Sequence, residues 1–232
     1  MTTDPRAAHP GAADPAADQA DLVRRGYDAL SYRYRADDAG LGEYAPWIER
    51  LLPLLPPAAA VLDLGCGCGC GVPVARALAG AGHRVTGVDI SEVQVSRARS
   101  LVPSATFIQA DVTRAEFGDD SFDAIVSLYT LIHVPVADQA GLLRRAGRWL
   151  RPGGRLLVTT GYDAWTGSDP AWLGGTTAMH WSQADAADSR RWISDAGLVI
   201  TGEETIPEGP SAHALFWARR PGPAARAEPA SQ

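Results

Sequence analysis

The sequence contains no lysine, so all 21 of its basic side chains are arginines. Its net charge of -6 at pH 7 disfavours nucleic acid as the main partner. No apolar run is long enough to cross a bilayer, and residues 1–19 lack the basic and apolar regions of a signal peptide. These absences favour a cytoplasmic protein that binds neither nucleic acid nor membrane. Monomer and homodimer both stay open.

Cysteine is also scarce, and its three copies stand at alternate positions, Cys66, Cys68 and Cys70. This C-x-C-x-C spacing is not a zinc spacing, and no fourth ligand lies nearby in the sequence. A disulfide is not expected in a reducing cytoplasm. We therefore expect no metal site and interpret the cysteines as small, buried residues of a crowded turn.

The length suits one α/β domain with short extensions. We expect a disordered tail over 1–19, a single domain over 20–219 and a flexible tail over 220–232. Strands are expected at 60–64, 84–89, 106–110, 122–128 and 155–160, and helices at 20–35, 44–52, 72–81, 92–101 and 137–150. Such alternation predicts a mostly parallel sheet covered by helices on both faces.

Residues 162–181 interrupt this alternation. The segment is rich in Gly, Trp and Thr, has no regular period, and is too long for a routine connection, which is typical of a lid or binding loop. A helix over 183–196, capped by Ser182, is expected next. Two strands, 198–205 and 212–218, then join through a Pro/Gly turn and predict an antiparallel edge of the sheet.

A glycine-dense turn follows the first core strand, over Val61–Gly71. Glycine lets a backbone approach a ligand closely, and the N–H groups of a following helix start point at it. Asp89 ends the next strand, where an acid can accept hydrogen bonds from a ribose. The turn lacks the G-x-G-x-x-G dinucleotide spacing, because Cys70, Val72 or Val74 occupies the third position. These features indicate a nucleoside-containing ligand other than a dinucleotide.

The pattern D-x-G-x-G-x-G that begins at Asp63 resembles the first motif of the class I S-adenosylmethionine-dependent methyltransferases. Later motifs of that family follow in order, at Val88–Ser91, Gln109–Val112, Phe122–Val126, Leu131–His133 and Leu150–Gly154. The resemblance covers roughly 22–219. It implies a Rossmann-like, doubly wound sheet of seven strands, mostly parallel with an antiparallel edge strand, and S-adenosylmethionine as cofactor.

The resemblance also implies roles for single residues. Asp89 would bind the ribose hydroxyls and Ile90 would pack on adenine, whereas Asp111 would accept from the adenine amino group. Tyr34 would lie over the sulfonium, as a cation–π contact allows. Alternatives stay open: both acids are common turn formers, and Tyr34 can pack on the core. The candidate cofactor-binding residues are Tyr34, Asp63, Gly65, Cys66, Gly67, Asp89, Ile90, Asp111, Val112 and Leu128.

Methyl transfer needs a base only when the acceptor carries a proton that must leave. The candidate catalytic bases are His133, His180 and His213, and each can equally be a structural histidine. Aromatic residues of the irregular segment and its surroundings would wall an apolar acceptor pocket, or pack that segment on the sheet. The candidate pocket residues are Tyr129, Trp165, Trp172 and Trp181.

Taken with the resemblance, these features predict a methyltransferase that acts on a small organic molecule in specialised metabolism. O-methylation is expected first. The alternatives are N-methylation of an amine or peptide N-terminus, and a cofactor-binding protein or cyclase on the same fold that transfers no methyl group.

Overall fold

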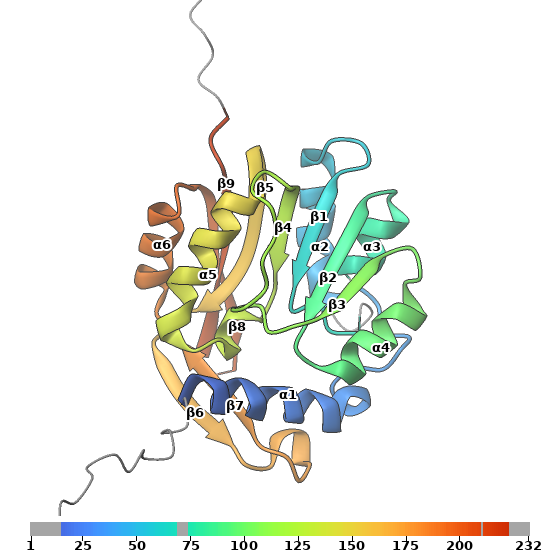
Figure 1. Cartoon of the computed structure of the whole chain (residues 1–232). Helices are drawn as coiled ribbons and strands as arrows, with labels where there is room; N and C mark the ends of the chain where they lie inside the picture. The colour runs from blue at the N-terminus through green and yellow to red at the C-terminus, as the bar shows by residue number, and fades with distance from the viewer. Residues whose placement is uncertain (1–14, 69–73, 210, 223–232) are drawn as a thin grey trace, which may run out of the picture.

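The computed structural model describes residues 15–68, 74–209 and 211–222 (Figure 1). Seven strands form one sheet in the order β3-β2-β1-β4-β5-β9-β8. The parallel strands are β1 (Ala60–Leu64), β2 (Arg84–Asp89), β3 (Thr106–Gln109), β4 (Phe122–Ser127) and β5 (Leu150–Gly161). β9 (Ser211–Arg219) pairs antiparallel with both β5 and β8 (Val199–Glu208). The predicted mostly parallel sheet with an antiparallel edge is confirmed.

Helices cover both faces of the sheet (Figure 1). Side chains alternate across a strand, so Val61 of β1 joins one apolar cluster and Leu62 joins the other. The first face carries α2 (Ala45–Leu51), α3 (Val74–Gly80) and α4 (Glu92–Leu101). The second carries α5 (Val136–Trp149) and α6 (Ala186–Asp195). Burial on both faces explains why the strand sequences read as nearly continuous apolar runs.

The helix α1 (Pro15–Tyr34) lies across the carboxyl ends of the parallel strands (Figure 1). It begins at Pro15, so the helix includes residues 15–19 of the tail that was expected to be disordered. Residues 1–14 and 223–232 lie outside the described residues. Asp28 on α1 accepts a hydrogen bond from Ser91 at the start of α4 over 2.6 Å, and Ser31 donates to Gln94 over 2.8 Å. These contacts hold α1 over the end of the sheet.

The segment expected to lack regular structure contains a two-stranded hairpin, β6 (Trp165–Asp169) and β7 (Met179–Gln183). Paired residues of an antiparallel hairpin share a face, and neighbours along a strand alternate. One face therefore holds both Trp165 and Trp181, and the opposite face holds the pair Ser168 and His180. A short 3₁₀ turn, η4 (Trp172–Gly174), lies between the two strands.

The start of α6 differs from the expectation. Asp185 is its N-cap and accepts from the Asp188 amide over 2.7 Å. Ser182 lies in β7 instead, and its hydroxyl accepts from the Val136 amide over 3.1 Å. The predicted Ser182 cap is wrong because pairing with β6 continues through Gln183.

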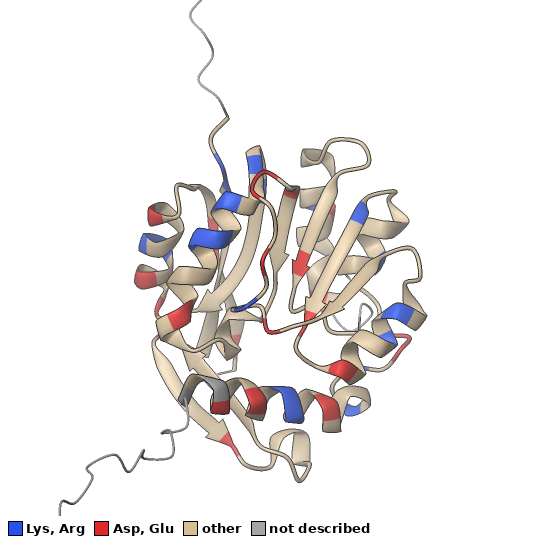
Figure 2. Cartoon of the chain, in the orientation of Figure 1, with Lys and Arg blue, Asp and Glu red and all other residues tan. Residues whose placement is uncertain are grey.

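Within the described residues, no helix combines the length and the apolar character that crossing a membrane requires. Acidic and basic segments alternate over the helices, without a long basic stretch in the part of the chain that the structure describes (Figure 2). The cytoplasmic location and the absence of a nucleic acid partner stay predictions.

Candidate functional site

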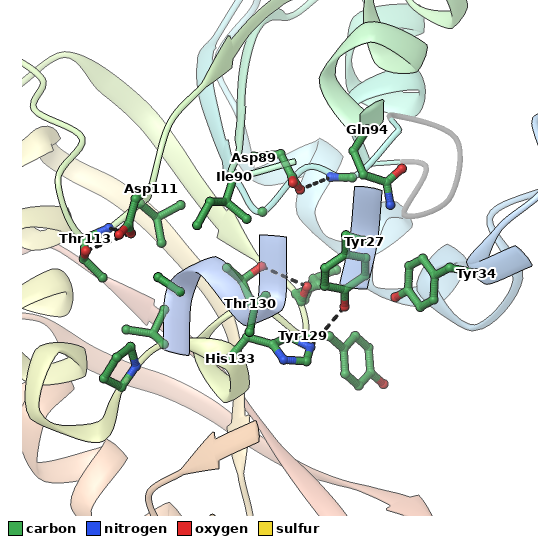
Figure 3. A pocket seen from close by; sticks show the side chains of 18 residues that line it. Tyr27, Tyr34, Asp89, Ile90, Gln94, Asp111, Thr113, Tyr129, Thr130 and His133 are labelled. Carbon is green, nitrogen blue, oxygen red and sulfur yellow. Dashed lines mark hydrogen bonds between the residues drawn. The ribbon is translucent and has the colours of Figure 1, made fainter. Parts of the chain in front are cut away.

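Two cavities open at the carboxyl end of the sheet, beneath α1. The first, here called the inner cavity, lies beside the glycine turn and the ends of β2 and β3 (Figure 3). The second, the outer cavity, has a volume of about 610 Å³ and is walled by the β6–β7 hairpin and the β8–β9 turn. That volume is typical of small-molecule sites. Four side chains line both cavities: Tyr27, Tyr34, Tyr129 and His133.

The glycine turn shapes one wall of the inner cavity. Gly65 and Gly67 have φ angles of 73° and 55°, which disfavour residues with a Cβ. A Cβ on Gly65 would lie 1.9 Å from the Thr130 hydroxyl oxygen, which donates to the Leu64 carbonyl over 2.9 Å. The backbone of β1 and the segment after β4 therefore approach each other where only glycine fits.

Asp89 ends β2 and lines the inner cavity. One carboxylate oxygen accepts from the Gly67 amide over 2.9 Å, and the other accepts from the Ser91 amide over 2.9 Å. A carboxylate has about four acceptor positions, so acceptor capacity remains for a ligand. Burial raises the pKa of Asp89 to about 6, and the two amide donors oppose that rise. The geometry suits a ligand that presents hydroxyl donors.

Asp111, after β3, is the second acid of the inner cavity. One of its oxygens accepts from both the amide and the hydroxyl of Thr113, over 2.8 and 2.7 Å. It thus shapes its own turn and also borders the cavity, while its acceptance from an adenine amino group stays a prediction. Eight of the ten candidate cofactor-binding residues line this cavity: Tyr34, Gly65, Gly67, Asp89, Ile90, Asp111, Val112 and Leu128.

The other two candidates, Asp63 and Cys66, do not line it. Asp63 is buried in β1, and its Oδ2 has no hydrogen-bond partner among the described residues. Burial raises the pKa of Asp63 to about 8. Cys66 is also fully buried, and its sulfur would lie 2.8 Å from a Cβ on Gly87. Both side chains are thus buried behind the glycine turn and do not face the inner cavity. Cys70 lies outside the described residues.

His133 lies in the 3₁₀ turn η3 (Leu131–His133), where the two cavities meet. Its Nδ1 is 2.8 Å from the His180 carbonyl oxygen, which can only accept, so Nδ1 carries the proton. Nε2 then accepts a hydrogen bond from the Tyr27 hydroxyl over 3.0 Å (Figure 3). Burial lowers the pKa of His133 to about 4, so the ring is neutral near pH 7.

The other two candidate histidines differ in position. The His180 side chain lines neither cavity, because it lies on the opposite face of the hairpin from Trp181, and it bonds Ser168 over 2.7 Å. His213 is buried, lines the outer cavity, and contacts the Glu208 carboxylate through Nε2 over 2.5 Å. Its ring packs edge-on against Tyr129 with centroids 5.1 Å apart.

The outer cavity contains all four candidate pocket residues, Tyr129, Trp165, Trp172 and Trp181. Sequence reasoning did not predict the further polar residues that line this cavity, which are Arg35, Glu43, Tyr44, Asp169, Gln183 and Glu208. They come from the residue after α1, the η1 turn (Gly42–Tyr44), the hairpin and the end of β8, so no local pattern joins them. Tyr27 was missed as well, although it lies seven residues before Tyr34 in the expected helix over 20–35, a spacing of two turns that places both on one face.

Comparison with known proteins agrees with the geometry. Residues 61–154 match the model of a methyltransferase domain family. The chain is 34% identical over 155 residues to methyltransferase GfsG of Streptomyces halstedii, covering 61% of this chain and 54% of that protein. It is 35% identical over 158 residues to 27-O-demethylrifamycin SV methyltransferase of Amycolatopsis mediterranei, covering 59% of this chain and 57% of that protein.

A solved structure shows the same fold. Magnesium protoporphyrin IX methyltransferase of Synechocystis, with bound S-adenosylmethionine, superposes with a TM-score of 0.66 at 20% identity. That match covers 90% of this chain and all of the other. Residues 61–154 thus carry a methyltransferase domain, and the chain is similar to the class I S-adenosylmethionine-dependent methyltransferases, whose cofactor is S-adenosylmethionine. It spans little more than half the length of the two curated relatives.

The residues of the inner cavity fit this cofactor. Asp89 ends β2, and Asp111 follows the adjacent parallel strand β3 by two residues, so both carboxylates lie where ribose and adenine donors require acceptors. Ile90, Val112 and Leu128 supply apolar walls for a purine ring. Among the described residues, no group of three potential ligands could hold a metal ion.

Proposed function

We propose that this protein transfers the methyl group of S-adenosylmethionine to a hydroxyl group of a small, largely apolar molecule. The observation that carries the proposal is the shared wall between the two cavities. Tyr27, Tyr34, Tyr129 and His133 border both, so a group in the inner cavity and a molecule in the outer cavity would meet among these side chains.

The inner cavity would hold the cofactor through acceptors and apolar contacts. Asp89 would accept from the ribose hydroxyls while it keeps its bonds to Gly67 and Ser91. Asp111 would accept from the adenine amino group, and Ile90 would pack on the ring. Tyr34 would border the sulfonium, to which an aromatic ring can make a cation–π contact.

When bound, S-adenosylmethionine supplies a methyl carbon activated by a positively charged sulfur. The protein's task is then to align the acceptor with that carbon and to keep water out. Helix α1 and the β6–β7 hairpin cover the site. Their contact consists of apolar and aromatic residues, including the fully buried Met179 and the nearly buried Trp172.

Tyr27 and His133 would take up the proton that leaves the acceptor hydroxyl. The Tyr27 hydroxyl donates its hydrogen bond to His133 Nε2. Its oxygen lone pairs can therefore accept a hydrogen bond from the hydroxyl of the substrate. As the acceptor oxygen gains the methyl group, its proton becomes strongly acidic. A neutral imidazole with a pKa near 4 is then a sufficient proton acceptor through Tyr27.

His213 is the second candidate base. Its contact with Glu208 is the arrangement in which a carboxylate orients an imidazole. However, His213 lines the outer cavity and not the inner one, whereas His133 borders both cavities. This placement favours the Tyr27–His133 pair for a hydroxyl held against the methyl group.

Incubation of the protein with an extract of its source cells and S-adenosylmethionine labelled in the methyl group tests the proposal. We expect label in a small metabolite, joined through oxygen. A label on nitrogen would support the alternative of amine methylation. Tight binding of the donor without any transfer would refute methyl transfer and support the non-transferring alternative.

A further inference from the structure

The outer cavity has an uneven charge. Among the described residues that line it, three are carboxylates, Glu43, Asp169 and Glu208, and Arg35 is the one guanidinium. The sequence has no lysine that could supply a further cation. An acceptor with a phosphate or carboxylate would therefore enter the outer cavity, from here on also called the chamber, in which negative charges are in excess.

Arg35 is already engaged. It donates to the Tyr44 hydroxyl over 2.8 Å, lies 3.8 Å from the Glu43 carboxylate, and sits 5.4 Å from the centroid of the Tyr44 ring. Arg35 and Glu43 thus neutralise each other at the α1 end of the chamber. Asp169 and Glu208 remain without an arginine partner among the described residues, although Asp169 accepts from the Ala171 amide over 2.9 Å and Glu208 contacts His213.

The same chamber is lined by indole rings. Trp165 and Trp181 share the cavity face of the hairpin with centroids 6.1 Å apart, and Asp169 lies on that face too. A Cβ on Gly167 would lie 2.5 Å from the Trp165 ring, so glycine lets this indole lie across the hairpin. Indole faces attract organic cations, especially beside carboxylates.

A buried polar atom gives an independent indication of a ligand. His213 is only 5% exposed and lines the chamber, yet its Nδ1 has no hydrogen-bond partner among the described residues. Its Nε2 is occupied by Glu208. Buried polar groups nearly always find partners. The unpartnered Nδ1 of His213 therefore points to a polar group that a bound molecule would supply near Glu208.

We propose that the acceptor carries a protonated amine, held by Glu208, Asp169 and the Trp165 and Trp181 rings, while a different atom is methylated. This inference rests on the proposed function and names its substrate class. Neither carboxylate borders the inner cavity, whereas Tyr27 and His133 border both. The amine would therefore anchor the acceptor away from the reacting atom, and the hydroxyl would reach Tyr27.

Three probes of one shape test the proposal: 3-phenylpropylamine, 3-phenylpropan-1-ol and 3-phenylpropionate. Their binding to the full chain, saturated with S-adenosylhomocysteine, is measured by calorimetry or ligand-observed NMR. We expect the amine to bind about tenfold more tightly than the alcohol, and the carboxylate to bind most weakly. Glu208→Gln and Asp169→Asn should each weaken amine binding about threefold and leave alcohol binding unchanged.

Asp195→Asn, which removes an exposed carboxylate of α6 outside both cavities, is the matched control and should change nothing. Equal binding of the amine and the alcohol, or no binding of any probe, would overturn the inference. The proposed function would stay intact in that case, provided that S-adenosylhomocysteine binds. If S-adenosylhomocysteine itself failed to bind, the proposed function would fall, and the same probe series without it would still decide the inference. Because Glu208 and Asp169 lie on separate elements, misfolding of one variant leaves the other as a test.

Discussion

The Tyr27 hydroxyl donates a hydrogen bond to Nε2 of His133 over 3.0 Å, and both side chains border both cavities. Tyr27 comes from α1 and His133 from the turn after β4, so the contact joins the covering helix to the sheet. The His180 carbonyl fixes the tautomer of His133 from the hairpin. Three separate elements thus fix the tautomer of His133 and its hydrogen bond to Tyr27.

Replacement of Tyr27 by Phe should lower kcat about a hundredfold, because general acid–base catalysis contributes 10²-fold or more. Donor affinity should stay within about twofold, since Tyr27 would contact the cofactor only through its ring. His133→Asn should have a similar effect. Steady-state kinetics with the labelled acceptor, together with calorimetry for S-adenosylhomocysteine, measure both.

His180→Ser is the control for this pair. Its side chain lies outside both cavities, and the backbone carbonyl that bonds His133 remains. We expect nearly unchanged kcat. Full turnover in the Tyr27 and His133 variants would show that no proton passes through them, and His213→Asn would then become the next variant to measure.

Replacement of Asp89 by Ala should weaken S-adenosylhomocysteine binding at least a hundredfold, because hydrogen bonds to a charged group contribute about 1.5–3 kcal/mol each. Asp111→Asn should cost less, about tenfold, because the amide keeps one oxygen acceptor. Calorimetry measures both, and circular dichroism checks the fold. An Asp89→Ala protein that binds as tightly as the wild type would exclude ribose binding by this carboxylate.

Donor affinity should depend on pH through Asp89. Ribose hydroxyls donate to the carboxylate, so binding favours its ionised form and lowers its pKa from about 6. Affinity should therefore be full above that pKa and fall as the pH drops through it. Calorimetry between about pH 8 and about pH 5 measures the slope. Asp89→Asn should bind weakly with little dependence on pH, and an equal slope in that variant would assign the titration to another group.

Replacement of Gly65 by Ala should lower the free energy of unfolding by about 3 kcal/mol or more. The cause is a positive φ angle together with the close approach of Thr130. Gly82→Ala, at a φ of 86° in open space, isolates the backbone effect and should cost about 1 kcal/mol. Urea denaturation measures both values. Adding Thr130→Gly should recover part of the loss at Gly65, and no recovery would locate the strain elsewhere.

The positions of the core strands were predictable from sequence. Ala60–Leu64 and Arg84–Asp89 are strands with the expected bounds, because buried parallel strands are short apolar runs between turn residues. The inner cavity followed from this regularity. Asp89 ends β2 and Asp111 lies two residues after the adjacent strand β3, so their placement at one edge of the sheet follows from strand order.

The hairpin and its consequences were not predictable. Trp165 pairs with Gln183 and Gly167 pairs with Trp181 in a segment whose sequence has no regular alternation, so neither strand was expected. Pairing register decides which side chains face the cavity, and it places His180 on the far side. The same pairing moves the start of α6 from Ser182 to Asp185.

The sequence by itself determined the cofactor and the sheet, because both depend on short motifs whose spacing is set by one strand, one turn and one helix. Only the tertiary structure decided which histidine borders both cavities and which charges line the outer one. Tyr27, His133, Asp169 and Glu208 come from four elements distant in sequence. Their contacts arise from packing and register, which no local pattern records.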